Sequence, residues 1–516
     1  MKKTKKQLRE MFSKPDWTLD TLLHADEVIS KVAKEYLKLD TFHNIFEVVT
    51  SEQLLDRMSL IGLPIGYDHW SFGKHRFYSE NSYKRGKMGL SYEMVINSNP
   101  CISYNIEENT TCLMLLVMAH AAQGHNSFFK NNYLFKMWTA PDAIVDYMNF
   151  AKKYIKECEE LYGFDEVEQT IDACHSIMRY GVDKYKHPPK LSAKNELERR
   201  KRKAAQDEAS YNDLWSKTVP VSELTPDEKR LKLLDKELAS QKFPKEPVEN
   251  MLYFMEKHSP VLEPWQREIC RIVRKVAQYF YPQAQTKTTN EGWATYCHHK
   301  IINKMYDEGY LSDGFMLEFI EHHTAVVAQP SFYSDWYHGF NPYALGFNIY
   351  QDIERMCKNP TEEDRKWFPN IAGGDWLEQV TYAMKNFKDE GFLLQYLSPK
   401  VMRDMQLFDL VDDQDKKYWY EIENIHNEAG YKRLREAINK QYMRDAYIPD
   451  IQIDKVDRQD RTLTLTYTSH DDVTLDVDDA YTVLEHINYL WGFPVILEHH
   501  FEDENVEICS VGMLEK

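Results

Sequence analysis

The chain has 516 residues, 43% of them hydrophobic and 13% aromatic, which is too long for one hydrophobic core and predicts two or three domains. Its 64 basic and 82 acidic residues give a formal net charge of −18. Such a chain repels polyanions and anionic lipids, so nucleic-acid-binding and membrane-surface proteins are disfavoured. No stretch approaches the ~20 apolar residues that a membrane-spanning helix needs.

The eight cysteines are spread along the chain without any CxxC pair, and several lie inside apolar periodic segments. This pattern is typical of reduced, buried thiols and disfavours a disulfide framework or a zinc ribbon. The basic N-terminal segment lacks the apolar stretch of a signal peptide. Together these features predict a cytoplasmic protein without an integral membrane segment.

Apolar residues at helical spacing predict helices between residues 16 and 60. Gly, Pro and aromatic residues interrupt this pattern at 61–80 and predict an aromatic-rich loop. Residues 90–106 alternate apolar and polar side chains around an Asn-Pro turn, which predicts a β-hairpin or small sheet beside a helical core. The apolar run that follows predicts a buried helix that ends at Gly124, because helices commonly stop at glycine.

Residues 186–248 are charge-dense and poor in aromatics, which predicts a solvent-exposed helical insertion or linker. Long helices are expected over 261–281, 290–308, 342–357 and 375–387. Near the C-terminus, short alternating segments flank a helix at 478–492 that Gly492 closes, which predicts a ββαββ unit. We therefore predict a mostly α-helical main domain with a small β-hairpin element, formed by 1–185 and 249–444 around the 186–248 insertion, and a C-terminal α+β domain at 445–516.

Two polar clusters interrupt apolar helices, and the first is HAAQGH at 120–125. On a regular helix a spacing of five separates the rings of His120 and His125 by about 140°, so they converge only if the chain turns at Gly124. Two neutral imidazoles held together are good ligands for zinc, iron or manganese. Two hydrogen-bonded core histidines would explain the same pattern.

The second cluster is TTNEGWATYCHHK at 288–300. Asn290 is the expected N-cap, which places Glu291 in the first helical turn, where the helix dipole favours a carboxylate. Glu291 and His298 share a helix face but lie roughly 10 Å apart along the axis, so they are expected to line one pocket without sharing an ion. A buried helix start with a capping glutamate is the competing interpretation.

Several long motifs in this chain resemble those of the SpoVR family: HAAQGHNSFFKNNYLF, TTNEGWATYCHH, DHWSFGK, FNPYALGFNIYQDIERM and SPKVMRDMQLF. The resemblance runs from about residue 16 to the C-terminus and includes the predicted α+β unit. It implies a role linked to sporulation through spore cortex formation, or to stationary-phase cell-envelope remodelling, since the family also occurs in bacteria that do not form spores.

A shorter likeness points to chemistry. NEGWATY is similar to the NEGFA-type helix of gluzincin aminopeptidases, in which the glutamate is the third zinc ligand. This likeness implies a divalent-metal site made of His120, His125 and Glu291, with zinc as the first expectation and iron or manganese as alternatives. The chain lacks the HExxH motif of those enzymes, so the base must come from elsewhere. His298, His323 and Glu268 are the candidate catalytic residues.

Two functions follow from these residues. One is a metal-dependent hydrolase that acts on an amide or a cell-wall-related substrate. The other is a non-catalytic regulator or scaffold that acts on a protein partner through its acidic surface, the 186–248 segment or the C-terminal domain. Because ligand bonds are near 2 Å, the three side chains of His120, His125 and Glu291 cannot share an ion if they lie more than ~8 Å apart. Their distance in the folded protein therefore decides whether this metal site exists.

Overall fold

The computed structural model describes residues 3–59, 65–84, 93–184, 242–244, 246–330, 334, 337, 339–407, 409–412, 420–423, 428–442, 448–469, 474–501 and 506–512. The chain forms two compact units, one of residues 1–161 and 278–447 and the other of 162–277 and 448–516. These boundaries differ from the predicted ones at 185, 248 and 444. Most of the predicted 186–248 insertion lies outside the described residues.

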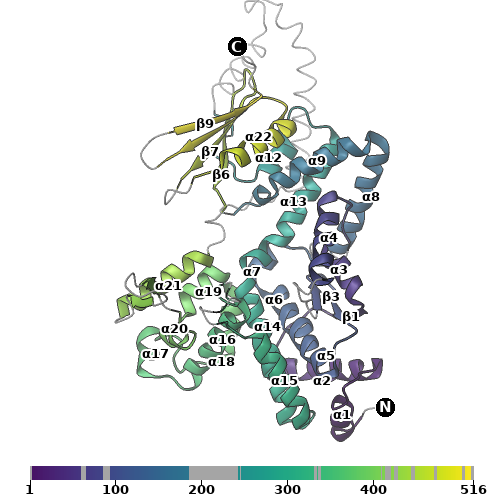
Figure 1. Ribbon diagram of the computed structural model, residues 1–516, viewed down its shortest axis with the longest axis vertical. Coiled ribbons are helices and arrows are strands. Elements are labelled where there is room, and N and C mark those ends of the chain that lie inside the picture. Colours follow the sequence, from purple (N-terminus) through teal and green to yellow (C-terminus); the bar gives the residue numbers. More distant parts are fainter. Residues whose placement is uncertain are drawn as a thin grey trace, which may run out of the picture. The chain divides into compact units, whose positions relative to one another are not determined.

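A mostly helical main part and a C-terminal α+β arrangement are confirmed (Figure 1). The helices of the first unit are α1 (Lys5–Phe12), α2 (Leu19–Tyr36), α3 (Ser51–Ser59), α4 (Trp70–Lys84), α5 (Thr111–Val117), η1 (Met118–His125), α6 (Asn126–Asn131), α7 (Tyr133–Trp138), α8 (Ile144–Tyr162), α14 (Lys287–Asp307), α15 (Asp313–Val326), α16 (Pro342–Lys358), α17 (Glu362–Trp367), α18 (Trp376–Asn386), α19 (Asp389–Tyr396), α20 (Pro399–Asp404) and α21 (Glu428–Tyr442).

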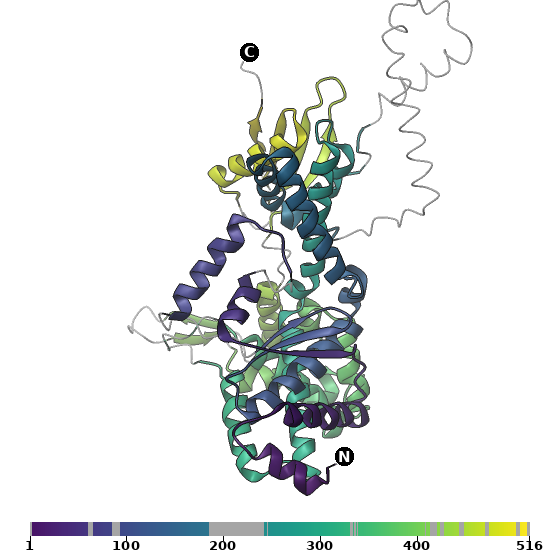
Figure 2. The same ribbon diagram turned by 90° about the vertical axis from the view of Figure 1, so that its right-hand side faces the viewer.

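Helix α14 is the centre of the first unit and is buried over most of its surface, as a helix with apolar residues on all sides should be. It packs against α2, η1 and α16 (Figures 1 and 2). Glycines set these spacings: a Cβ on Gly124 would lie 2.5 Å from Cα of Ala294, and one on Gly292 would lie 2.4 Å from Cα of Gly346. The backbones of η1, α14 and α16 are therefore in close contact directly beside Glu291.

The predicted start of this helix at Asn290 is wrong, because α14 begins at Lys287. The carboxylate of Asp389 accepts hydrogen bonds from the backbone N–H of Thr288 at 2.9 Å and of Thr289 at 2.7 Å. A side chain distant in the sequence thus satisfies the free N–H groups of the first turn. Glu291 lies in the second turn, and the side chain of Asn290 is left for another contact.

The predicted helix end at Gly124 is also wrong. The chain runs from α5 through η1 into α6 without a break, and η1 is a π-helix. Within it, the carbonyl of Ala122 accepts a hydrogen bond from Nδ2 of Asn44 at 3.1 Å, and that of Gly124 accepts one from Oγ of Ser127 at 2.8 Å. Side chains therefore satisfy carbonyls in the widened turn, as buried backbone groups require.

A three-stranded sheet of order β1-β3-β2 lies in the first unit and contains the predicted hairpin, with β2 (Glu93–Ile96) antiparallel to β3 (Cys101–Ile106). Strand β1 (Asn44–Val49) pairs parallel to β3, so the expected helix over this segment is wrong; its β-branched, aromatic composition suits a strand.

The expected loop at 61–80 is wrong from Trp70 onward, where α4 begins. A two-stranded sheet, β4 (Asp409–Asp412) with β5 (Tyr420–Glu423), completes this unit.

The second unit contains α9 (Phe164–Ser176), η2 (Met178–Tyr180), α12 (Met251–His258), α13 (Pro264–Gln285, whose last residues belong to the first unit) and α22 (Val477–Trp491). Its sheet has the order β6 (Ile451–Val456), β7 (Leu463–Thr468), β8 (Val495–His500) and β9 (Val506–Val511). Helix α22 packs on β8, β9 and α9 (Figure 1). Gly492 ends α22 with φ at 78°, which confirms the predicted ββαββ unit and its glycine stop.

Candidate metal centre

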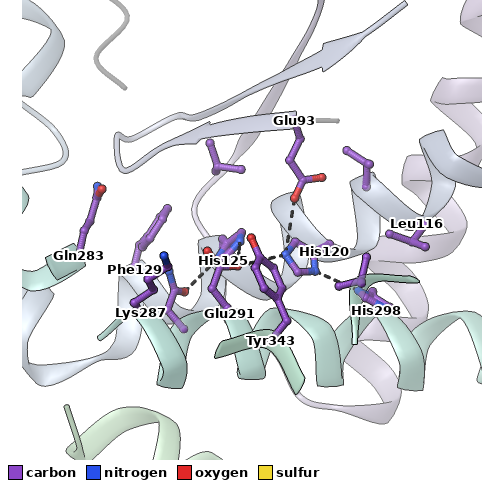
Figure 3. A pocket seen from close by; sticks show the side chains of 14 residues that line it. Glu93, Leu116, His120, His125, Phe129, Gln283, Lys287, Glu291, His298 and Tyr343 are labelled. Carbon is purple, nitrogen blue, oxygen red and sulfur yellow. Dashed lines mark hydrogen bonds and ion pairs between the residues drawn. The ribbon is translucent and has the colours of Figure 1, made fainter. Parts of the chain in front are cut away.

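A cavity of about 530 Å³ lies in the first unit, between the hairpin strand β2 and helices η1, α14 and α16. Figure 3 shows histidines and carboxylates meeting in its middle. Its lining residues come from sequence positions more than two hundred residues apart: Glu93, Val95, Leu116, Val117, His120, His125, Phe129, Gln283, Lys287, Asn290, Glu291, His298, Val326 and Tyr343.

His120 and His125 lie side by side because η1 is a π-helix. Its i→i+5 hydrogen bonds bring residues five apart back to one face, whereas an α-helix would separate them by about 140°. The two ring centroids are 4.7 Å apart and the ring planes are at 84°. Both side chains are buried, and π-helical segments of this kind occur frequently at functional sites.

Glu291 closes a triangle with these two histidines. Its Oε2 lies 3.6 Å from Nε2 of His120 and 3.4 Å from Nε2 of His125. This buried oxygen accepts no hydrogen bond of normal geometry from the described residues. Ligands of a tetrahedral ion bound at 2.0–2.1 Å are about 3.3 Å from one another. The spacing therefore suits atoms around a small cation better than atoms that hydrogen-bond directly.

Glu93 is a fourth member that sequence reasoning missed. Its Oε1 lies 3.6 Å from Nε2 of His120, and one ligand atom each from Glu93, His120 and His125 all fall within 4.8 Å of one another. Glu93 is the first residue of β2, and the alternation of apolar and polar residues at 90–106 was its only signal. Alternation predicts a strand but does not show that the polar side chain faces helices.

A chain of hydrogen-bonded histidines leads away from this cluster. Nδ1 of His120 lies 2.9 Å from Nδ1 of His298, and Nε2 of His298 lies 2.9 Å from Nδ1 of His323. If Nε2 of His120 holds an ion, its Nδ1 donates to His298, and His298 donates in turn to His323. All three side chains are buried, so these two hydrogen bonds determine both the tautomer and the ring orientation of His120.

Asn290 and Tyr343 support the other members. Oδ1 of Asn290 lies 2.9 Å from Nδ1 of His125, so this nitrogen is the donor and Nε2 is left to face Glu291. The ring of Tyr343 stacks on that of His120 at 6.2 Å (Figure 3). Tyr343 belongs to the FNPYALGFNIYQDIERM motif, but nothing in the motif alone marked the tyrosine as part of a site.

The buried charged groups of the cluster shift one another's pKa values. Burial alone would raise the pKa of Glu291, but the imidazoles of His125 and His120 lower it far below its ordinary value. Burial would lower the pKa of His125, but Glu291 and Glu93 raise it. Burial raises the pKa of Glu93, and it lowers the pKa of His298 well below the ordinary value. The two carboxylates thus favour positive charge at the imidazole of His125.

The structure brings together His120, His125 and Glu291, and places His298 and His323 behind them. The remaining candidate, Glu268, belongs to the second unit, where it pairs with Arg271, and it does not line the cavity. No helix in the described part of the chain is long and apolar enough to cross a membrane.

Comparison with known proteins agrees with the motifs. The family described as SpoVR like protein matches residues 16–446, and that described as SpoVR-like C-terminal domain matches residues 449–502. The chain is also 53% identical over 497 residues to the protein of Escherichia coli (strain K12) named "Uncharacterized protein YcgB", which covers 96% of this chain and 95% of that protein. No solved structure matches this chain. With both family descriptions matched over nearly its whole length, the chain belongs to the SpoVR family.

Proposed function

We propose that this protein is a metal-dependent hydrolase whose divalent ion is held by His120, His125 and Glu291. The observation that carries the proposal is the buried Oε2 of Glu291, which faces Nε2 of both histidines at 3.4 and 3.6 Å without a hydrogen bond. Two imidazoles and one carboxylate leave an open position, as catalytic zinc sites require. Zinc is therefore the first candidate, with iron and manganese as alternatives.

Glu93 supplies the base that the missing HExxH motif would have provided. Its carboxylate contacts His120 at 3.6 Å from the side of the hairpin, opposite α14 (Figure 3). A bound divalent ion supplies Lewis acidity and makes a water more acidic. Glu93 then accepts a proton from the water that adds to the amide carbonyl carbon, and it returns that proton to the nitrogen as the C–N bond breaks.

Tyr343 and the histidine chain have supporting roles. The carboxylate of Glu291 and the burial of Tyr343 raise the pKa of its phenol, so it remains a hydrogen-bond donor beside the reacting carbonyl. His298 and His323 hold the ring of His120 in position through its Nδ1. Because the resemblance to the SpoVR family implies a role in spore cortex formation or in envelope remodelling during stationary phase, a cell-wall-related substrate is the one that we propose.

Metal analysis of the purified full chain tests the proposal. We expect about one divalent ion per chain in the wild type and loss of that ion in His120→Ala, His125→Ala and Glu291→Gln. His322→Ala is the matched control, because His322 lies on the surface side of α15, 3.6 Å from Glu318. A wild-type chain that takes up no zinc, iron or manganese, or site variants that bind as the control does, would overturn the assignment.

A further inference from the structure

The cavity around the candidate metal centre has two chemically different sides. Figure 3 shows Gln283, Phe129 and Lys287 on one side of the two ligand histidines and Leu116 and His298 on the other. A molecule that spans the centre therefore meets a cation, a carboxamide and an aromatic ring at one end, and a leucine and an uncharged histidine at the other. This asymmetry restricts which amides fit.

Lys287 is the only lysine or arginine among the described residues that line this cavity. It lies one turn before Glu291 on α14, a spacing at which lysine and glutamate commonly pair on a helix surface. Glu291 instead faces His120 and His125, and no described residue forms an ion pair or hydrogen bond with the Lys287 side chain. Its charge is available to a bound anion.

Resting on the proposed hydrolase, we propose that the substrate is a short peptide cleaved next to its free carboxyl terminus, and that Lys287 binds this carboxylate with Gln283 beside it. Lys287 and Glu291 lie four residues apart, which is about 6 Å along the helix axis. One peptide residue spans roughly 3.5 Å, so a carboxylate one residue beyond the cleaved carbonyl is on the scale of this separation.

A carboxylate fits this end of the cavity better than a phosphate does. Only one cation lines the cavity among the described residues, and Glu93 and Glu291 add two negative charges. The proposed divalent ion offsets these two carboxylates, so the charge left for a ligand at this end of the cavity is that of Lys287, which a single carboxylate matches.

The test compares two hydroxamates that chelate the metal in the zinc-loaded full chain. Succinic monohydroxamate carries a carboxylate, and acetohydroxamate does not. We expect the wild type to bind the first about five- to tenfold more tightly. Lys287→Met should remove this preference while acetohydroxamate binding persists, and Lys287→Arg should keep it. Lys152→Met, a charge change on the exposed surface of α8, should also keep it.

Peptide competition then identifies the source of the carboxylate. N-acetyl-Ala-Ala with a free terminus should displace succinic monohydroxamate better than the amides of N-acetyl-Ala-Ala and N-acetyl-Asp-Ala do. Equal affinity of the two hydroxamates in the wild type, or a preference that survives in Lys287→Met, would overturn the role of Lys287 but not the proposed hydrolase. If the aspartyl amide displaces the hydroxamate equally well, recognition of a carboxyl terminus is overturned. Failure to bind zinc or either hydroxamate overturns the hydrolase together with this inference.

Discussion

The imidazole centroids of His120 and His125 lie 4.7 Å apart, although the two residues are five positions apart in the sequence. On an α-helix the equivalent neighbours are four apart, as in the HExxH motif that this chain lacks. The extra residue is accommodated by the π-helical turn of η1. A spacing of five on a π-helix is thus equivalent to a spacing of four on an α-helix, because each brings the two side chains to one face.

This equivalence predicts opposite results for two single-residue deletions in η1. Deleting Ala122, between the histidines, leaves a spacing of four that an α-helix brings to one face, so metal affinity should fall by no more than about tenfold. Deleting Ala119, before His120, leaves a spacing of five on an α-helix and should abolish binding. Both alanines are fully buried, which makes the pair well matched. Metal content and circular dichroism measure the outcome, and equal loss in both would contradict the equivalence.

Asn290→Ala should weaken metal binding without unfolding the protein. The variant removes the acceptor that holds Nδ1 of His125 at 2.9 Å, and loss of such a partner typically costs 10–100-fold in metal affinity. Competition with a coloured chelator measures the affinity. Asn303→Ala is the control on the same helix, since among the described residues Asn303 donates only to the carbonyl of His299. Equal affinities in the two variants would show that Asn290 does not orient His125.

Removal of His298 should act on the metal through His120. His298→Phe leaves the buried Nδ1 of His120 without its partner at 2.9 Å, so we expect a drop in zinc affinity of roughly 10–100-fold. His323→Phe is one hydrogen bond further away and should have a smaller effect. Isothermal titration of the zinc-free chain measures both. An affinity for zinc that is unchanged in His298→Phe would rule out the positioning role.

Two glycine substitutions should destabilise the first unit. In Gly124→Ala and Gly292→Ala the new Cβ meets backbone atoms at 2.5 and 2.4 Å, which requires η1 or α16 to shift and costs about 1–3 kcal/mol. Gly314→Ala, in the exposed first turn of α15, meets nothing within 4 Å and should be neutral or stabilising by up to ~1 kcal/mol. Urea unfolding followed by fluorescence compares the three variants; a stable Gly292→Ala would disprove the tight backbone contact.

Asp364 should make stability depend on pH in the acid range. Its carboxylate accepts two hydrogen bonds from Arg355, both 2.7 Å, and despite its burial these contacts lower its pKa from 3.8 to about 2. A carboxyl with a lower pKa in the folded state stabilises the protein above about pH 4, and this contribution is lost as the pH falls toward 2.

We therefore expect Asp364→Asn to lower the apparent Tm at pH 7 by roughly 3–5 °C, and the difference from wild type to shrink below pH 4. Thermal unfolding monitored between pH 3 and 7 measures this. Glu363→Gln, whose carboxylate pairs with Arg403 on the surface, is the control and should change the Tm little at any pH. A difference that stays constant down to pH 3 would contradict the role of the Asp364 carboxylate.

The sequence by itself determined the features that depend on short stretches of chain. Alternation over 451–511 with a helix between strand pairs predicted the ββαββ unit, and Gly492 marked the helix end, because strand and helix periods are visible within ten to fifteen residues. The residue types of His120, His125 and Glu291 likewise marked a candidate site, since imidazole and carboxylate are metal ligands wherever they occur.

Only the tertiary structure decided which of these residues meet and how. Glu93 arrives on a hairpin and Tyr343 on α16, and the π-helical turn that aligns the histidines is stabilised by Asn44 from β1. These are contacts between segments tens to hundreds of residues apart, set by the close packing of η1, α14 and α16 at their glycines. Local periodicity carries no information about such contacts, because they depend on which faces the whole fold buries together.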